Sequence, residues 1–277
     1  MLTLQICITR SALVAMKTDL ARALPDVKSS HRVEGLARGF GFRTYAALRA
    51  ATLSGDAPIV TADGRAFTNY LHEHRFSVSE KCFYLAAGRA ALQSVLRRTP
   101  NLGIHGIYSG RPERISSGAL ESESEVDARL VRLREELIED AAIEEFLMSL
   151  AMLGHLQPTR TVRKDAWSYR LKEIAEKYSC TYPNGGKIGR GYVSNGSLIA
   201  AAIHAGFRYE ICLDGSGRNS LNVYFNMSKR EVDDLDCEIR PNHAFAESRR
   251  WRDERRKIEA SLRRNYGLRR ARLKTAM

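Results

Sequence analysis

Apolar side chains near the start of the chain recur at the spacing of an amphipathic helix. Residues 11 to 24 follow this spacing and stop at Pro25, so the sequence predicts a helix that ends there. The ten residues before it are apolar, but they lack a basic leading segment and reach Arg10 before any small-residue cleavage site. We therefore expect a β-strand in this stretch and not a secretory signal.

Two further helices are predicted next, joined by a glycine turn. Ser29 or Ser30 is the expected N-cap of the first helix, and Gly41 is its expected left-handed stop. Thr44 is the expected cap of the second helix, which runs to Ala51. This order of helix, turn and short helix is that of a helix-turn-helix unit, although an ordinary helical hairpin would have the same pattern.

A functional interpretation of this unit places two arginines, Arg43 and Arg49, against DNA. The short second helix offers few polar side chains that could read the edges of bases. We therefore expect contacts with the phosphate backbone and not sequence readout, since phosphate contacts position a protein without specifying a sequence.

The pattern in the middle of the chain is less regular. Residues 56 to 79 mix turn-forming residues with short apolar runs, which predicts turns around one or two strands. Residues 80 to 98 have the pattern of a helix, and residues 100 to 118 that of an extended loop or linker. Between residues 121 and 153 the apolar positions predict one long amphipathic helix or two abutting helices.

A third part of the chain begins at Trp167. We expect a helix in SYRLKEIAEKY, a glycine-rich loop in PNGGKIGRG, and a helix in VSNGSLIAAAIHAGF that Ser194 or Asn195 caps. YEICLD and LNVYFNM flank the turn-rich GSGRNS, as the strands of a β-hairpin do. Ser228 and Glu231 have the spacing of a capping box and predict a short helix after the hairpin.

Together these elements predict an α+β fold that is mostly helical. We expect residues 1–99 to form a helical N-terminal module with the helix-turn-helix-like unit, and residues 100–164 a linker and a long amphipathic helix. Residues 165–242 are expected to form a small module of helices and a β-hairpin, and residues 243–277 a basic C-terminal helix or tail. With 277 residues, 44% of them hydrophobic, the chain is long enough to bury such cores.

Positive charge is concentrated near the end of the chain. The chain has 44 Lys and Arg against 32 Asp and Glu, a net charge of +12. Residues 243 to 277 hold 12 of the basic and 4 of the acidic residues, a net of +8, which leaves +4 for residues 1 to 242. A segment this basic can neutralise phosphates and release their counterions, so we expect the tail to bind nucleic acid.

The tail also carries two aromatic residues that could stack on unpaired bases. In the glycine-rich loop, Lys187 and Arg190 are candidates for contacts with the nucleic-acid backbone. Alternatives for the tail are a solvated amphipathic helix, or an arm that docks on an acidic protein or an anionic membrane surface. The expected nucleic-acid contacts of the tail are Arg249, Arg250, Trp251, Arg252, Arg255, Arg256, Lys257, Arg263, Arg264, Tyr266, Arg269, Arg270 and Arg272.

The cysteines and the apolar stretches bear on the compartment. The five cysteines are odd in number, widely spaced and without a Cys-x-x-Cys pair, which fits a reducing environment. The longest apolar runs are far shorter than the roughly 20 residues that cross a bilayer. We therefore expect a cytoplasmic protein that does not insert into membranes.

Two segments resemble proteins of mobile genetic elements. From about residue 165 to 228 the chain contains SYRLKEIAE, YVSNGSLIAAAIHAGF and an asparagine-rich hairpin near Asn219 and Asn222. This segment is similar to one in uncharacterised plasmid, phage and integrative-element proteins, and residues 29 to 48 resemble N-terminal regions of plasmid-borne proteins. The resemblance implies a mobile-element setting and no reaction. That family usually has a histidine where this chain has Glu173, so we place no ligand site there.

Groups that could carry catalysis or bind a metal are scattered along the sequence. Histidines two positions apart share a face only on a strand, and no third metal ligand is evident near them. We therefore expect no enzyme, no cofactor and no metal site. A catalytic interpretation would require the fold to gather one of two clusters: His72 and His74 with Glu80, or His204 with Tyr192 and Asn195.

The function that the sequence favours is that of a non-catalytic, nucleic-acid-binding accessory protein of a bacterial mobile genetic element. Among nucleic acids, DNA is the expected partner ahead of RNA. The alternative is a protein-interaction factor, such as an inhibitor of a host system, that binds an acidic partner through its basic surface.

Overall fold

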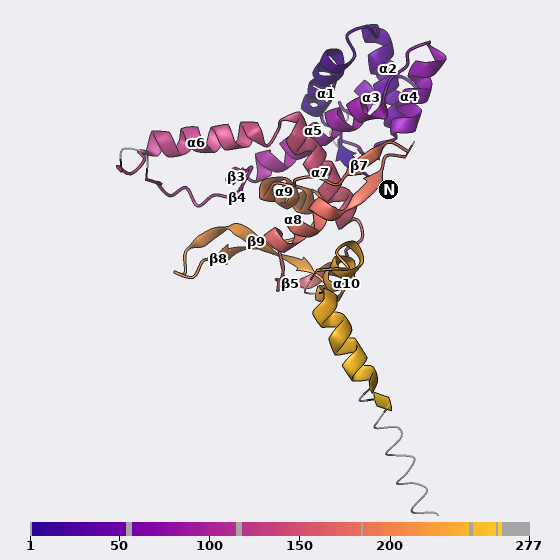
Figure 1. Ribbon diagram of the computed structural model, residues 1–277. Coiled ribbons are helices and arrows are strands. Elements are labelled where there is room, and N and C mark those ends of the chain that lie inside the picture. Colours follow the sequence, from indigo (N-terminus) through magenta and orange to yellow (C-terminus); the bar gives the residue numbers. More distant parts are fainter. Residues whose placement is uncertain are drawn as a thin grey trace, which may run out of the picture. The chain divides into compact units, whose positions relative to one another are not determined.

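The computed structural model describes residues 2–53, 57–114, 118–183, 185–243, 246–258 and 260–261. The chain divides into two compact units, residues 1–232 and residues 233–277, which we call unit 1 and unit 2. Unit 1 contains all of the described strands, and unit 2 contains the end of α10 and a helix over residues 246–258. The expected fold class is confirmed, because the structure is α+β and mostly helical (Figure 1).

Helices form most of unit 1. They are, in chain order, α1 (Arg10–Ala23), α2 (Ser29–Gly39), α3 (Tyr45–Ala51), α4 (Gly64–Glu73), α5 (Glu80–Arg98), α6 (Glu123–Glu136), α7 (Asp140–Leu153), α8 (Ser168–Lys177), α9 (Asn195–His204) and α10 (Lys229–Ile239).

The strands form small antiparallel sheets. They are β1 (Gln5–Cys7), β2 (Ile59–Thr61), β3 (Leu102–Gly103), β4 (Gly106–Ile107), β5 (Pro158–Trp167), β6 (Ser179–Thr181), β7 (Lys187–Gly189), β8 (Tyr209–Leu213) and β9 (Asn219–Met227). β1 pairs with β2, β3 with β4 and β6 with β7, while β5, β9 and β8 form a three-stranded sheet in that order.

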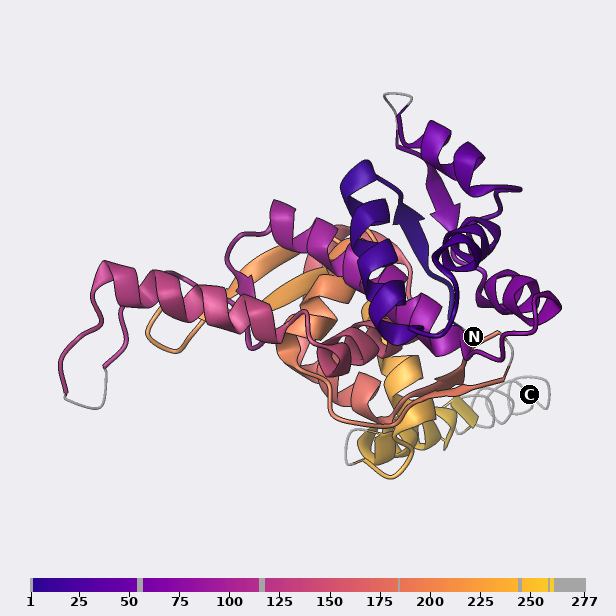
Figure 2. The same ribbon diagram turned by 90° about the horizontal axis from the view of Figure 1, so that it is seen from above.

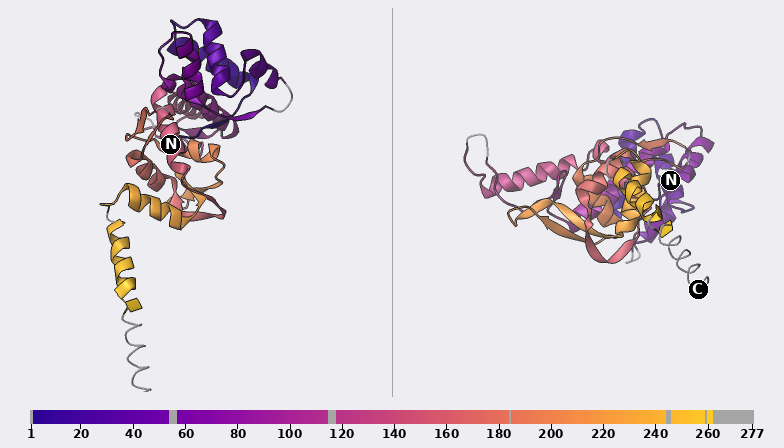
Figure 3. Two further views of the ribbon diagram at one scale, coloured as in Figure 1. Left: turned by 90° about the vertical axis from the view of Figure 1, so that its right-hand side faces the viewer. Right: turned by 60° about the horizontal axis from the view of Figure 1, so that its bottom comes forward.

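Unit 1 is organised around the apolar helices α5, α7 and α9. α1 packs on α5, α7 packs on both α5 and α9, and α8 lies between α9 and the three-stranded sheet. The helices α1 to α4 gather at one end of unit 1, and the sheet lies at the opposite end (Figures 1 and 3). Figure 2 shows α6 and the β8–β9 hairpin projecting from the same side of unit 1.

The first residues of α9 are polar and buried, and they join α9 to two other parts of the fold. We call residues 194–197 the α9 start. The backbone amide of Gly196 donates to the carbonyl of Ile104, in the β3–β4 turn, at 2.8 Å. The side-chain amide of Asn195 donates to Asn222 Oδ1 in β9 at 3.1 Å. Because buried polar groups are costly unless they are paired, these bonds fix where the turn and β9 meet α9.

The α9 start is also bonded to α7. The backbone amide of Ser194 donates to Glu145 Oε2 at 2.8 Å, and Ser197 Oγ donates to the carbonyl of Ala142 at 3.2 Å. Both serines are fully buried. Ser194 also caps α9, since its hydroxyl accepts from the amide of Ser197 at 3.1 Å.

Several elements agree with the expectations from the sequence. α5 has the expected bounds of 80 and 98, and the hairpin β8–β9 forms around the expected turn. Thr44 Oγ1 accepts from the amide of Ala47 at 3.1 Å, as an N-cap does. Gly41 adopts the left-handed conformation, with φ of 81°, where α2 ends. These features depend on local chemistry, which explains why a sequence pattern can predict them.

One of the strands expected in residues 56–79 is present as β2, but the segment also contains a helix that was not predicted. α4 begins after Asp63, whose carboxylate accepts from the amide of Ala66 at 3.0 Å. Phe67 and Leu71, four positions apart, are fully buried under α2. The turn-forming residues before α4 concealed this short helical repeat.

The long amphipathic helix resolves into two helices, α6 and α7. Leu137 is fully buried at the break between them. Arg89 of α5 donates from Nε to the carbonyl of Ile138 at 3.0 Å and also pairs with Asp140 at the start of α7. The break is therefore stabilised by a side chain from another helix, which the sequence pattern could not reveal.

Other local expectations need correction. The glycine-rich loop around residues 183–191 is mostly a hairpin, β6–β7, and β5 was not anticipated. Ser29 is the first residue of α2 and not its cap, since Lys28 occupies the cap position without a side-chain hydrogen bond. By contrast, the helix predicted after Ser228 forms as α10, since Ser228 Oγ accepts from the amide of Glu231 at 3.4 Å, and the carboxylate of Glu231 accepts from the amide of Gln157 at 2.9 Å.

We predict that Gly196→Ala destabilises unit 1 by about 1–3 kcal/mol or more, although alanine normally favours a helix over glycine. A Cβ at position 196 would lie 2.1 Å from the carbonyl oxygen of Gly103, so α9 would have to move off the β3–β4 turn. Urea unfolding followed by circular dichroism measures the change. Gly191→Ala is the control, because a Cβ there meets nothing within 4 Å; an equal effect of both changes would contradict the packing argument.

Candidate nucleic-acid interface

The structure brings Lys187 and Arg190 together on one pocket. Both line a pocket of about 390 Å³ between α7 and the β6–β7 hairpin, and Tyr192 lines it as well. Lys187 and Arg190 are exposed, so both cations are open to a ligand. Among the acidic residues of this pocket, Glu144 pairs with Lys81 and Glu145 holds the α9 start.

Arg43 and Arg49 lie in the α2–α3 region, and both are exposed. Glu34 Oε2 accepts from the amide of Tyr45 at 3.0 Å and so fixes the start of α3 on α2. Leu48 anchors the opposite face of α3 in the core. The outward face of α3 carries mainly alanines beside Arg49. This composition offers cations for phosphates and few groups that could read bases.

Part of the predicted tail surface lies in the helix over residues 246–258 of unit 2. Trp251 has 76% of its surface exposed. Arg249 pairs with Asp234, which engages one of the predicted cations within unit 2. The other described cations of the set, all exposed, are Arg250, Arg252, Arg255, Arg256 and Lys257. The predicted contacts Arg263, Arg264, Tyr266, Arg269, Arg270 and Arg272 lie outside the described residues.

A second concentration of positive charge lies within unit 1. Residues 158–193 contain eight Lys and Arg against three Asp and Glu, a net of +5. Since residues 1–242 together carry +4, the remainder of that stretch has a net charge of −1. The excess positive charge of the chain before the tail therefore belongs to β5, α8 and the β6–β7 hairpin.

The same segment exposes three aromatic rings, two of which lie beside one lysine. The rings of Trp167 and Tyr169 lie 5.8 Å apart between centroids. Lys172 Nζ lies 5.1 Å from the centroid of Tyr169 and 5.0 Å from that of Tyr192. The exposed fractions are 38% for Trp167, 43% for Tyr169 and 65% for Tyr192. We call these four side chains the aromatic–lysine surface.

The core of unit 1 positions Tyr169. Leu171, Ile174 and Ala175 of α8 are fully buried, so the opposite side of this helix faces outward. Ser168, which is also buried, accepts through its hydroxyl from the amide of Val223 in β9 at 3.2 Å. Tyr169 follows this anchored serine and lies on the exposed side of α8.

Tyr192 and Lys172 are positioned by one carboxylate. Glu176 Oε1 accepts from Lys172 Nζ at 2.6 Å and from the amide of Val193 at 3.4 Å. Tyr192 precedes Val193, and the α9 start follows directly. Burial opposes the charge of Lys172, but the hydrogen bond to Glu176 and the two tyrosines raise its pKa above the ordinary value. The lysine is therefore cationic at neutral pH.

These three rings were not among the contacts predicted from the sequence. Stacking was predicted for Trp251 and Tyr266 of the tail, where most of the excess charge lies. Within residues 165–228, Ser194 and Asn195 are buried in the fold, whereas Tyr169 and Tyr192 are exposed. A usable signal was present, since aromatic residues alternate with Lys and Arg in this segment.

The structure does not gather the first catalytic cluster. Glu80 is buried beside Gly64, at the first residue of α4. His74 lies at the other end of this ten-residue helix, about 15 Å away along its axis, where its ring is tilted by 44° against that of His31 at 4.5 Å between centroids. Within the described ranges, no group of three or more His, Cys, Asp or Glu is placed to hold a metal ion.

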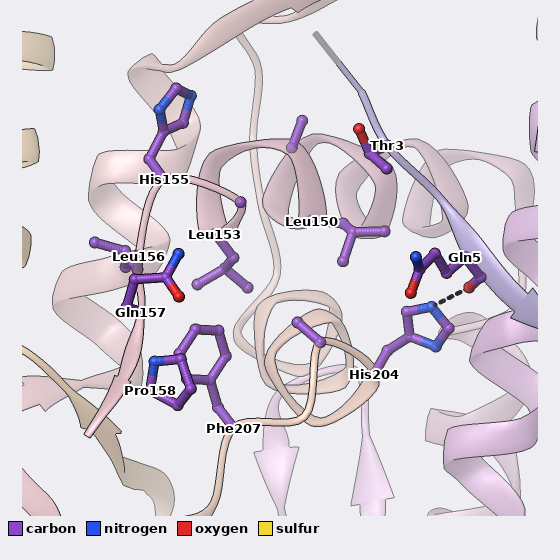
Figure 4. Close-up of a pocket in the computed structure, with 13 residues that line it drawn as sticks. Thr3, Gln5, Leu150, Leu153, His155, Leu156, Gln157, Pro158, His204 and Phe207 are labelled. Atoms are coloured by element: carbon purple, nitrogen blue, oxygen red, sulfur yellow. Dashed lines mark hydrogen bonds between the residues drawn. The ribbon is translucent and has the colours of Figure 1, made fainter. Parts of the chain in front are cut away.

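The second cluster is not gathered either. His204 ends α9 and Asn195 begins it, so about 13 Å of helix separates them. His204 lines a different pocket, of about 790 Å³, shown in Figure 4. Its Nε2 donates to the carbonyl of Gln5 at 2.8 Å, and His155 in the same pocket pairs with Tyr178 Oη at 2.9 Å.

The comparisons with known proteins add no relative. No protein-family model, no curated protein and no solved structure matches this chain. In the part of the chain that the structure describes, no helix is both long and apolar enough to cross a membrane.

We predict that protonation of His204 destabilises unit 1. Burial lowers the pKa of His204 below its ordinary value and the charge of Arg98 adds to this, while the bond to Gln5 opposes it. The fold thus favours the neutral ring, and its stability contribution is complete above the ordinary pKa and is lost as the pH falls through it. The free energy of unfolding, measured from about pH 8 to about pH 5, should fall more steeply for the wild type than for His204→Gln, which cannot take up the proton. Parallel curves would contradict this assignment.

Proposed function

We propose that this protein is a non-catalytic, nucleic-acid-binding accessory protein of a bacterial mobile genetic element. The observation that carries the nucleic-acid part is the coincidence, in residues 158–193, of a +5 charge with three exposed aromatic rings. The mobile-element part is supported by the sequence resemblance alone. DNA is the partner that we put first.

Charge and rings supply the two contributions that nucleic-acid binding requires. Lysine and arginine neutralise phosphates and release counterions, which gives affinity that does not depend on sequence. Exposed aromatic rings add stacking on bases. The basic helix of unit 2 and the arginines Arg43 and Arg49 are further candidate contacts with phosphates.

The rival function is that of a factor that binds an acidic protein. Basic surfaces steer acidic proteins as well as nucleic acids. The exposed rings support nucleic acid, since a flat ring beside a cation matches the combination of base and phosphate in each nucleotide. Binding measurements separate the two functions directly.

We predict that binding of the full-length protein to labelled DNA weakens steeply with salt. Fluorescence anisotropy over a series from about 50 to about 300 mM salt gives the slope of log K against log salt concentration. Lys187→Gln combined with Arg190→Gln should make the slope shallower by about 1–2, because each lost phosphate contact removes about 0.7–0.9. For a chain that ends at residue 242, this slope should be shallower by several further units.

The matched control removes two exposed cations elsewhere in unit 1, by Arg22→Gln with Arg97→Gln. This variant should change the slope by less than about 0.5, because removing charge away from the bound DNA affects the slope less than removing a phosphate contact does. If no DNA binds to the wild type at the lowest salt, the proposed function is wrong and acidic proteins become the partners to test.

A further inference from the structure

We propose that the aromatic–lysine surface binds unpaired bases, so that the substrate of this protein is single-stranded nucleic acid. The inference rests on the proposed function and specifies its substrate class. It depends on the placement of Trp167 beside Tyr169 and of Tyr169 and Tyr192 beside Lys172, which the fold creates from three separate elements. β5 supplies the tryptophan, α8 supplies one tyrosine and the lysine, and the segment before α9 supplies the other tyrosine.

The three rings leave a large part of their surface exposed. Large aromatic side chains usually bury most of their surface, whereas Tyr192 leaves 65% of its surface exposed. Other rings of unit 1, such as Phe67, Phe83 and Tyr84, are fully buried. The fold therefore has room for aromatic residues in its core, and the exposed cluster is not a consequence of a small interior.

Hydrogen bonds fix the residues that carry the two tyrosines. Glu176 fixes Lys172 and the segment that carries Tyr192, and the buried α9 start fixes the other end of that segment. The rings are thus presented by a rigid frame, which lowers the entropy lost when a ligand orders them. Lys172, which is 9% exposed and paired with Glu176, contacts both tyrosines, and the exposed cations beside Tyr192 are Lys187 and Arg190.

The chemistry of stacking favours a single strand over a duplex as the ligand of these rings. In a duplex the faces of the bases are covered by neighbouring bases, so only the ends of the helix offer a face to a protein ring. In a single strand each base can present its face. Three adjacent rings with flanking cations, such as Lys187 and Arg190 beside Tyr192, match bases and phosphates along one unpaired strand.

The fluorescence of one tryptophan tests the proposal directly. The chain has two tryptophans, Trp167 and Trp251, so Trp251→Phe leaves only the indole of the proposed surface. Titration of this full-length variant with a single-stranded oligothymidylate should quench the emission of Trp167. The same concentration of a blunt duplex of equal length should leave the emission nearly unchanged. Trp167→Phe is the matched control that reports on the tail.

Ring substitutions give the second measurement. Tyr192→Leu should weaken single-strand binding about tenfold and leave duplex binding within about twofold, because it removes one stacking ring and no charge. Tyr70→Leu is the control, since Tyr70 in α4 also has a cation near its ring, Arg38 at 5.9 Å, and lies outside the residues proposed to contact nucleic acid. An oligonucleotide of the same length without bases should bind wild type and Tyr192→Leu equally.

The outcomes separate the two proposals. If single strands bind, Trp167 is quenched and Tyr192→Leu weakens the binding, the inference stands. If DNA binds but Trp167 is not quenched and Tyr192→Leu does not weaken the binding, the aromatic–lysine surface does not bind bases. The same conclusion follows if polyglutamate of equal charge competes as well as the single strand. In either case the proposed function can still rest on the basic tail. If neither strand form binds at low salt, both proposals fail. A Tyr192→Leu variant with a lower melting temperature would be replaced by Tyr192→His, which keeps a ring and should retain most of the binding.

Discussion

The buried polar start of α9 is the constraint on which the rest of unit 1 depends. Ser194, Asn195 and Ser197 are enclosed by α7, the β3–β4 turn and β9, and each of them forms hydrogen bonds to one of these elements, while Asn195 Oδ1 is buried without a partner among the described residues. A buried polar group costs free energy when its partner is displaced, so each bond fixes one neighbour in place. Gly196 allows the turn to approach closely, because a Cβ there would collide with the backbone of Gly103.

This constraint also links the fold to the proposed function. The segment that leads into α9 is held by Glu176 and Glu145, and it carries Tyr192 on its exposed side. The polar residues of the segment form hydrogen bonds inside the fold, while its aromatic residue, Tyr192, faces solvent. Residues 168–197 therefore contain two kinds of residue, those that form the packed frame and those that are exposed on it.

How far the sequence predicts the structure depends on the range of the interactions. The caps Thr44 and Ser194, the stop at Gly41 and the bounds of α5 follow from contacts within a few residues, and they were predicted. The break between α6 and α7 depends on Arg89, almost fifty residues away, and was left open. The helix α4 was missed because its turn-rich surroundings outweighed a short apolar repeat that α2 buries.

By itself the sequence determined the mostly helical α+β class, the local caps and turns, and the location of the basic tail, because composition and short-range spacing fix these properties. Only the tertiary structure decided which aromatic residues are exposed. Tyr169 and Tyr192 meet at Lys172, and Trp167 lies beside Tyr169, because β9, α8 and the α9 start pack together. Periodicity cannot reveal this, since whether a ring is buried or displayed depends on contacts between segments that are far apart in the chain.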